Sequence, residues 1–125
     1  HRIDGTLMCH YRHVAHTDPF YYPGLQDITS HIDFTAVSDA AMDAGAELAG
    51  YCTQASFLLS LGLLENHADR YDPGLPTPES VHKAREIKKL TLPHEMGELF
   101  KVAAFTRRYP EPLSGFGMQN LAGKL

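Results

Sequence analysis

The chain has little of what defines several common protein classes. Its two cysteines, Cys9 and Cys52, follow no metal-ligand or disulfide pattern, so we expect a reducing, cytoplasmic compartment. No apolar run reaches the roughly 18 residues of a membrane span, and no signal peptide is recognisable. A net charge of −4 and a pI of about 6.0 indicate no basic face for nucleic acid. Because the chain begins at His1 without an initiator methionine, we expect a fragment or a processed product.

The composition that remains is that of a globular protein. A chain of 125 residues with 43% hydrophobic residues is one domain, or part of one, with a modest core. The basic residues are scattered except in the run over 83–89. That run has helical spacing and lies beside Glu79 and Glu86, so it is expected to be a solvated helix face.

The stretch over 27–34 is the most informative part of the sequence. Asp27, Thr29, His31 and Asp33 alternate there with Ile28, Ser30 and Ile32. On a strand these four side chains would share one face, because successive residues point to opposite sides. A helix then begins at once, with Asp33 placed to cap it. The pattern fits the wall of a functional site, and it fits equally a capped helix preceded by a polar turn.

Periodicity and turn residues predict a mixed α/β chain of short elements. An apolar helical stripe begins at Phe34 and ends at Gly45, while Thr53 and Thr77 stand where two further helices should be capped. The apolar run over 99–105 is typical of a buried central strand. In order, we expect strand 6–11, a long functional loop over 12–26, helix 34–44, strand 47–52, helix 54–61, a turn-rich segment over 66–76, helix 78–90, strand 99–105 and an extended or loosely docked tail over 107–125.

In the last quarter of a Rossmann-like methyltransferase, the elements follow this same order along the chain. In that fold the last strand returns antiparallel beside the preceding one. The return would bring Thr53 and Gln54 next to Met96, Gly97 and Glu98. Ligands bind at the carboxyl ends of strands in open α/β sheets, so these residues become candidates for a site.

Motifs along nearly the whole chain carry a family resemblance. They are Gly5-Thr6-Leu7, Tyr11-Arg12-His13, the run over 23–29, His31-Ile32-Asp33-Phe34, Thr53-Gln54 with Phe57-Leu58 and Gly62, Leu92-Pro93, the run over 96–102 and Pro112-Leu113-Ser114-Gly115-Phe116. In order and spacing they resemble the MidA family, SAM-dependent methyltransferases related to a mitochondrial complex I assembly factor. The last motif also resembles bacterial members, from which we expect the natural C-terminus to be present.

The cofactor-binding motifs of such an enzyme are absent. A Gly-rich turn lets backbone approach the cofactor, and an acidic residue accepts the ribose hydroxyls. The chain contains no Gly-x-Gly-x-x-Gly sequence. The resemblance therefore covers only the C-terminal, substrate-side third of an enzyme with a Rossmann-like class I fold. We assign 1–106 to that part and 107–125 to its tail, and expect S-adenosyl-L-methionine to bind a part outside this chain.

The resemblance implies methyl transfer from SAM to a protein side chain, with arginine as the expected acceptor. The acceptor nitrogen must be held in line with the sulfonium methyl, beside a carboxylate or a histidine. The expected catalytic residues are Asp27, Asp33 and His13, and the expected substrate-binding residues are Thr29, His31, Gln54, Met96 and Gly97. The implied partners are a protein substrate and the missing N-terminal SAM-binding part, and a homo-oligomer stays open.

Two other function classes stay open on the sequence. The chain could be a non-catalytic protein-binding or assembly module. The series His10, His13, His16 could hold a metal in a hydrolase, although the strand-then-loop pattern around it disfavours convergent ligands. Phe20, Tyr21 and Tyr22 fit either a lid over substrate or simple loop anchors.

Overall fold

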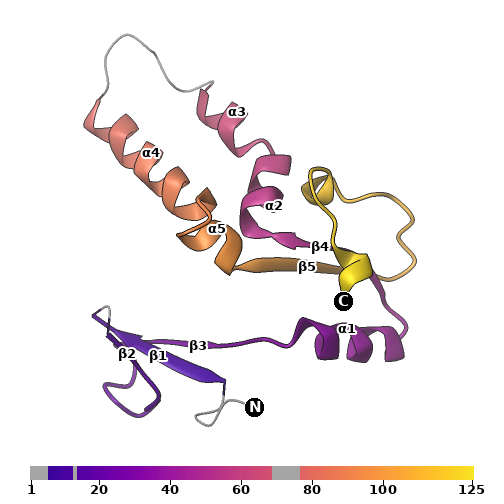
Figure 1. Ribbon diagram of the computed structural model, residues 1–125, viewed down its shortest axis with the longest axis horizontal. Helices are drawn as coiled ribbons and strands as arrows, with labels where there is room; N and C mark the ends of the chain where they lie inside the picture. Colours follow the sequence, from indigo (N-terminus) through magenta and orange to yellow (C-terminus); the bar gives the residue numbers. More distant parts are fainter. Residues whose placement is uncertain (1–5, 13, 69–76) are drawn as a thin grey trace. The chain divides into compact units, whose positions relative to one another are not determined.

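The computed structural model describes residues 6–12, 14–68 and 77–125 (Figure 1). These residues mix strands and helices, as the sequence predicts. They fall into two compact units, His1–Phe34 and Thr35–Leu125. The elements are β1 (Leu7–Tyr11), β2 (Val14–His16), β3 (Asp27–Ser30), α1 (Phe34–Asp43), β4 (Glu47–Thr53), α2 (Gln54–Ser60), α3 (Leu63–Ala68), α4 (Pro78–Thr91), α5 (Met96–Leu99), β5 (Lys101–Thr106) and two 3-10 turns, Ser114–Phe116 and Ala122–Lys124.

The first unit is an antiparallel sheet with the strand order β2-β1-β3. Cys9, at the centre of β1, pairs with His16 on β2 and with Ile28 on β3, and it is fully buried. The strand predicted over 6–11 is confirmed. The loop predicted over 12–26 is wrong at its start, because β2 folds back on β1 after Arg12, which has a φ of 46°. A strand of three residues is too short to show a period.

The second unit is built on the antiparallel pair β4 and β5, whose pairing the sequence predicts correctly. Glu47 pairs with Thr106 at one end and Thr53 with Lys101 at the other, with a bulge between Leu48 and Gly50. The predicted start of the last strand is wrong, because Leu99 ends helix α5 and the strand begins at Lys101. The prediction of a central strand is also not met among the described residues, where β5 pairs with β4 alone.

Helices α2 and α4 begin at the predicted caps. The Thr53 hydroxyl accepts the backbone N–H of Ser56 at 3.3 Å and starts α2, and Gly62, at a φ of 79°, follows its end. The segment predicted as turns over 66–76 is helical at its start, because α3 extends to residue 68. The rest of that segment lies outside the described residues.

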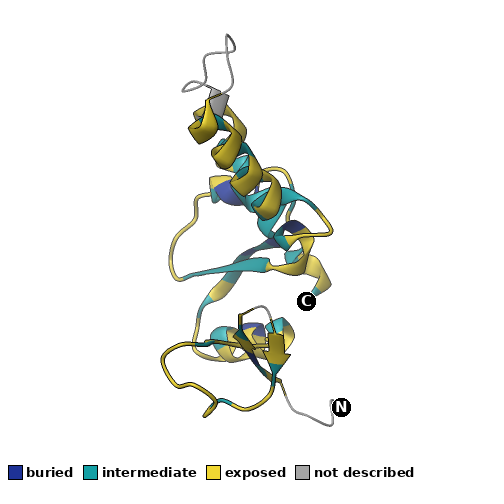
Figure 2. Cartoon of the chain, turned by 90° about the vertical axis from the view of Figure 1, so that its left-hand side faces the viewer, coloured by how far each residue is buried: buried dark blue, intermediate teal, exposed yellow. Residues whose placement is uncertain are grey.

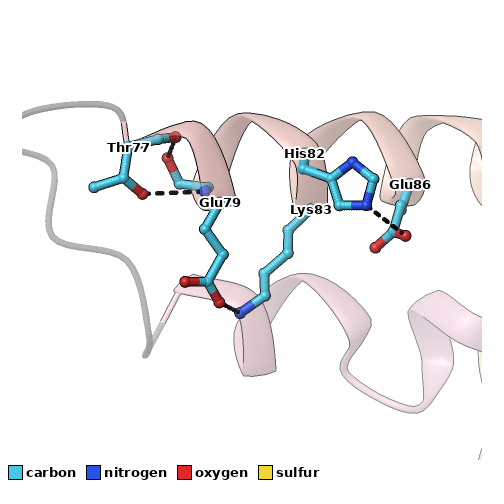
Figure 3. Close-up of polar contacts among 6 residues, drawn as sticks. Thr77, Glu79, His82, Lys83 and Glu86 are labelled. Carbon is cyan, nitrogen blue, oxygen red and sulfur yellow. Dashed lines mark hydrogen bonds and ion pairs between the residues drawn. The ribbon is translucent and has the colours of Figure 1, made fainter.

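The basic run on α4 is a solvated face, as predicted. Thr77 caps the helix by accepting the N–H of Ser80 at 3.1 Å (Figure 3). Lys83 pairs with Glu79 at 2.8 Å, one turn apart on the exposed face. The hydrogen bond and charge of Lys83 lower the pKa of Glu79 below its ordinary value. His82 and Glu86 form a second pair at 3.1 Å with the same spacing (Figure 3). Exposed pairs of this kind add solubility more than stability.

The sequence predicts an extended or loosely docked C-terminal tail, and in the structure the tail is docked against β4. The N–H of Leu121 donates to the carbonyl of Tyr51 at 2.6 Å, along the edge of β4 away from β5. The Phe116 ring lies over Gly50 so closely that a Cβ on that glycine would collide with it. Phe116 also meets Phe57 of α2 edge to face, with ring centroids 5.5 Å apart. The tail therefore belongs to the packing of the second unit.

The apolar core of the described residues is small (Figure 2). Cys9, Cys52 and Phe116 are its buried hydrophobic side chains. Large apolar residues elsewhere stay open to solvent, among them Leu25 at 70% and Leu99 at 71% exposed. None of the helices in the described ranges is long and apolar enough to cross a bilayer.

Replacing Phe116 tests the docking of the tail. Phe116→Ala should lower the free energy of unfolding of the second unit by about 3–5 kcal/mol, because a buried ring is lost and a cavity remains. Met118→Ala is the matched control, since Met118 is 65% exposed, and should change stability by less than about 0.5 kcal/mol. Urea unfolding followed by circular dichroism measures both. If Phe116→Ala prevents folding, Phe116→Leu supplies a milder change. Equal stability of all variants would contradict a docked tail.

Candidate functional site

The polar face of β3 is shorter than the sequence predicts. Asp27 and Thr29 lie on β3 two residues apart, so they share one face, and both are exposed. Asp27 pairs in register with His10, and Thr29 with Met8. The Thr29 hydroxyl donates to the Met8 carbonyl at 3.1 Å. This bond holds the Thr29 side chain against β1. The hydroxyl has used its one proton, so it can only accept a further hydrogen bond.

His31 and Asp33 do not continue that face. The strand ends at Ser30, and residues 31–33 are neither strand nor helix. The N–H of His31 still donates to the Thr6 carbonyl at 3.0 Å, which extends the pairing with the first strand by one step. The prediction of one strand that carries all four side chains on a shared face is therefore wrong, because the strand ends at Ser30. Asp33 stands directly before helix α1, at the capping position.

The long loop after β2 is held by its own aromatic side chains. The ring centroids of Tyr11 and Tyr22 are 4.9 Å apart, and those of Tyr21 and Tyr22 are 4.4 Å apart. The neighbouring Tyr22 raises the pKa of Tyr21 above its ordinary value through charge repulsion, with burial and a hydrogen bond adding to it. Gln26 donates its Nε2 to the Pro19 carbonyl at 2.7 Å. These contacts favour the role of loop anchors for the two tyrosines, whereas Phe20 is 83% exposed.

A second group of predicted residues meets in the other unit. The N–H of Gln54 donates to the Phe100 carbonyl at 3.0 Å, which joins the start of α2 to the end of α5. The side-chain Nε2 of Gln54 donates to the Leu90 carbonyl at 3.0 Å, near the end of α4. The proximity of Thr53 and Gln54 to the segment over 96–98 is thus confirmed. Gln54 therefore joins α2 to α4 through its side chain and to the residue that follows α5 through its backbone N–H.

Gly97 is buried at the corner between α4 and α5. Its N–H donates to the Leu92 carbonyl at 3.1 Å, and a Cβ there would collide with the Thr91 carbonyl. Met96 accepts the N–H of Phe100 at 3.2 Å through its carbonyl. The corner therefore requires glycine for close packing of backbone. The backbone contacts that the structure gives to Met96 and Gly97 belong to this corner.

The predicted site residues thus form two groups. Asp27, Thr29, His31 and Asp33 belong to the first unit, and Gln54, Met96 and Gly97 to the second. His13 lies outside the described residues. Within the described part, no three His, Cys, Asp or Glu side chains gather where they could hold one metal ion.

The second unit also contains a hollow of about 450 Å³ that the sequence does not signal. None of the predicted site residues lines it. Its wall includes Ser38, which is 3% exposed and whose hydroxyl has no hydrogen-bond partner within the described ranges. A helical serine between polar and apolar neighbours carries no local signal of such a position. The hollow is lined by Ser38, Asp39, Met42, Ala46, Glu47, Leu48, Ala122 and Leu125.

Gln54 can be tested for a structural role. Gln54→Ala should lower the free energy of unfolding by about 1–3 kcal/mol, because it leaves the part-buried Leu90 carbonyl without its donor. Gln54→Glu should destabilise similarly, since a carboxylate cannot donate to a carbonyl. His82→Ala, on the exposed face of α4, is the control and should change stability by less than about 0.5 kcal/mol. Unfolding curves unchanged in both Gln54 variants would leave this residue free for a ligand.

The matching family model and one of the matching solved structures are both described as methyltransferases. Residues 1–52 match the family model described as "Putative S-adenosyl-L-methionine-dependent methyltransferase". Over 97% of this chain, a Burkholderia thailandensis protein is 48% identical, with a TM-score of 0.84. Its crystal structure is described as that of a superfamily member and "likely methyl transferase" bound to S-adenosyl-homocysteine. A native crystal structure of an uncharacterised superfamily protein from the same organism has 48% identity over 97% of this chain and a TM-score of 0.83.

The length of the match limits what is carried over. The chain spans 31% of the first of these proteins and 32% of the second, about a third of each. No curated protein matches the chain. Over residues 1–52 this chain is thus similar to a family described as S-adenosyl-L-methionine-dependent methyltransferases, and over nearly its whole length to a protein crystallised with S-adenosyl-homocysteine.

Proposed function

We propose that this chain is the substrate-side part of a SAM-dependent methyltransferase that modifies a protein side chain. The observation that carries the proposal is the 48% identity, over 97% of this chain, to a protein crystallised with S-adenosyl-homocysteine. That molecule is what remains of SAM after its methyl group has been transferred. The motifs that resemble the MidA family, with its Rossmann-like fold, support arginine as the acceptor.

In this proposal the cofactor binds outside the chain. The sequence contains no Gly-x-Gly-x-x-Gly turn, and therefore no acidic residue placed after such a turn to accept the ribose hydroxyls. The small apolar core and the exposed large apolar residues also support a chain that packs against a further part of an enzyme. When bound there, SAM would supply an electrophilic methyl group, while residues of this chain would hold the acceptor.

The residues proposed to hold the methyl acceptor are Asp27, Asp33 and His13. Thr29 and His31 lie close to the two aspartates in the sequence. Asp27 and Asp33 are exposed carboxylates within the first unit. A carboxylate can bind a guanidinium through two parallel hydrogen bonds and so orient its nitrogen. Such orientation is the main requirement of methyl transfer. Gln54, Met96 and Gly97 would keep the helices α2, α4 and α5 together within the second unit.

The absence of a cofactor motif gives a direct prediction. Isothermal calorimetry with the purified chain and SAM should detect no binding, because the glycines that admit the cofactor are missing. The B. thailandensis protein is the positive control. A dissociation constant near 1 µM for the chain alone, equal to about −8.2 kcal/mol, would contradict cofactor binding outside it.

A chimera tests whether Asp27 and Asp33 hold the methyl acceptor. The matching third of the B. thailandensis protein is replaced by this chain, and labelled SAM is supplied with an arginine-containing peptide library. Asp27→Asn and Asp33→Asn should each lower methyl transfer by on the order of 10²-fold with little change in melting temperature, because the acceptor loses its orientation. Asp43→Asn, at the exposed end of α1, is the matched control and should keep the parent rate.

The other outcomes separate the alternatives. If both variants melt lower but transfer methyl groups at the parent rate, the two aspartates are structural. A capping aspartate alone would cost about 1 kcal/mol of stability. A folded chimera that binds SAM and transfers no methyl group to any peptide would favour a non-catalytic binding or assembly module.

A further inference from the structure

The hollow of the second unit lies where helix α1 turns into strand β4 (Figure 1). Gly45, at a φ of 78°, makes this turn, and its N–H donates to the Met42 carbonyl at 2.9 Å. The N–H of Ala46 donates back to helix α1 at 2.9 Å as well. Ala122 and Leu125 of the tail complete the wall. The volume of about 450 Å³ is within the range of sites that bind small molecules.

Helix α1 turns a polar side chain, not an apolar one, toward the interior. Ser38 is the buried residue of this helix at 3% exposed, whereas Val37 and Met42 are 43% and 52% exposed. An amphipathic helix normally buries its apolar side. The Ser38 hydroxyl also has no hydrogen-bond partner within the described part of the chain. A buried hydroxyl without a partner costs free energy, so it favours a ligand that supplies the missing bond.

Two carboxylates line the same hollow. Asp39 follows Ser38 on α1, and Glu47 is the first residue of β4. Both are exposed at the mouth of the hollow, and the ion pairs among the described residues lie on α4, so neither carboxylate has a cationic partner there. Lys124, next to the lining residue Leu125, is exposed and pairs with neither of them in that part of the chain. Two negative charges on adjoining elements favour a cation between them.

The rest of the wall indicates an organic cation. The described residues hold no cluster of three His, Cys, Asp or Glu side chains that could bind a metal ion. Met42, Ala46 and Leu48 instead give the hollow an apolar surface, which suits the methylenes of an alkyl chain. A guanidinium matches the polar groups better than an ammonium does. It is planar and weakly hydrated, and its several N–H donors can bond a carboxylate through two parallel hydrogen bonds.

We propose that the hollow binds a guanidinium group carried on an alkyl chain. The guanidinium lies between Asp39 and Glu47 and donates one N–H to the Ser38 hydroxyl, which rotation about χ1 brings into position. The alkyl chain packs on Met42 and Leu48. Such a group is found in an arginine side chain of a protein and in small alkylguanidines. Binding here uses no SAM and none of the residues proposed to hold the methyl acceptor, so its failure and that of the proposed function are distinguishable.

A titration followed by ¹⁵N NMR tests the site with three small probes. n-Butylguanidine should shift the amides of Asp39, Glu47 and Leu48. Its neutral isostere n-butylurea should bind about 5-fold or more weakly, because it lacks the charge. Methylguanidine, which lacks most of the alkyl chain, should bind about 10-fold or more weakly. Equal affinities for n-butylguanidine and n-butylurea would overturn the proposal, as would shifts confined to residues outside the hollow.

Variants of the two carboxylates test their charges. Asp39→Asn and Glu47→Gln keep the shape of the side chain, and each should weaken n-butylguanidine binding by about 3-fold or more. Glu111→Gln is the matched control, because Glu111 is exposed in the tail and does not line the hollow. It should keep the parent affinity. An unchanged affinity in both hollow variants would contradict a site between the two carboxylates.

The role of Ser38 is tested by a variant in which stability and binding should change in opposite directions. Ser38→Ala should keep or raise the melting temperature, because no bond is lost and alanine is the better helix former. It should nevertheless weaken n-butylguanidine binding by about 5-fold or more, because a hydrogen bond to a charged group is lost. A lower melting temperature would show that the hydroxyl is bonded within the protein, and this result would overturn the proposal.

The chimera with the B. thailandensis protein tests the hollow in the presence of the rest of an enzyme. n-Butylguanidine should bind the chimera as tightly as it binds this chain. Loss of binding in a folded chimera would show that the remaining part covers the hollow, and the proposal would be wrong. Two more probes identify the source of the ligand. Binding of N-acetylarginine N-methylamide would support a protein side chain, whereas binding of agmatine without it would support a small alkylguanidine. Binding of neither would overturn the proposal.

Discussion

The packing of the second unit depends on the contacts that β4 makes along its two edges and on one face. One edge pairs with β5, and the other receives the tail through Gln119, Asn120 and the N–H of Leu121. On one face, Gly50 leaves room for the Phe116 ring, and the strand ends at Thr53, which starts α2. Because these contacts share a strand of seven residues, loosening the tail would disturb the sheet and the first helix after it together.

How much of this fold the sequence predicts depends on how local each interaction is. Thr53 and Thr77 cap helices by bonding three residues ahead, and Gly45 turns the chain at a φ of 78°, so each leaves a signal within one turn. Asn120 bonds Tyr51 across 69 residues, and Gln119 bonds Thr53 across 66. No periodicity reports a side-chain amide that substitutes for a strand partner. The sequence therefore predicts only an extended or loosely docked tail, whereas these bonds hold the tail against β4.

The candidate site shows the same division. The shared face of Asp27 and Thr29 follows from the two-residue period of a strand, and the sequence predicts it. Its extension to His31 and Asp33 fails, because the strand ends at Ser30 and no alternating polar pattern in the sequence marks that end. The closeness of Gln54 to α5 was predicted from strand topology. The hydrogen bond from the Gln54 amide to the Leu90 carbonyl could not be predicted, because it depends on where α4 ends.

The distribution of apolar and polar groups connects the architecture with the proposed chemistry. The chain offers exposed carboxylates at Asp27 and Asp33, but few buried hydrophobic side chains to hold their surroundings rigid. An acceptor must be positioned to within a fraction of an ångström for methyl transfer, and a sparsely packed unit does not supply that precision alone. If Asp27 and Asp33 orient the acceptor as proposed, part of the order that this orientation needs has to come from packing of the first unit against the rest of the enzyme.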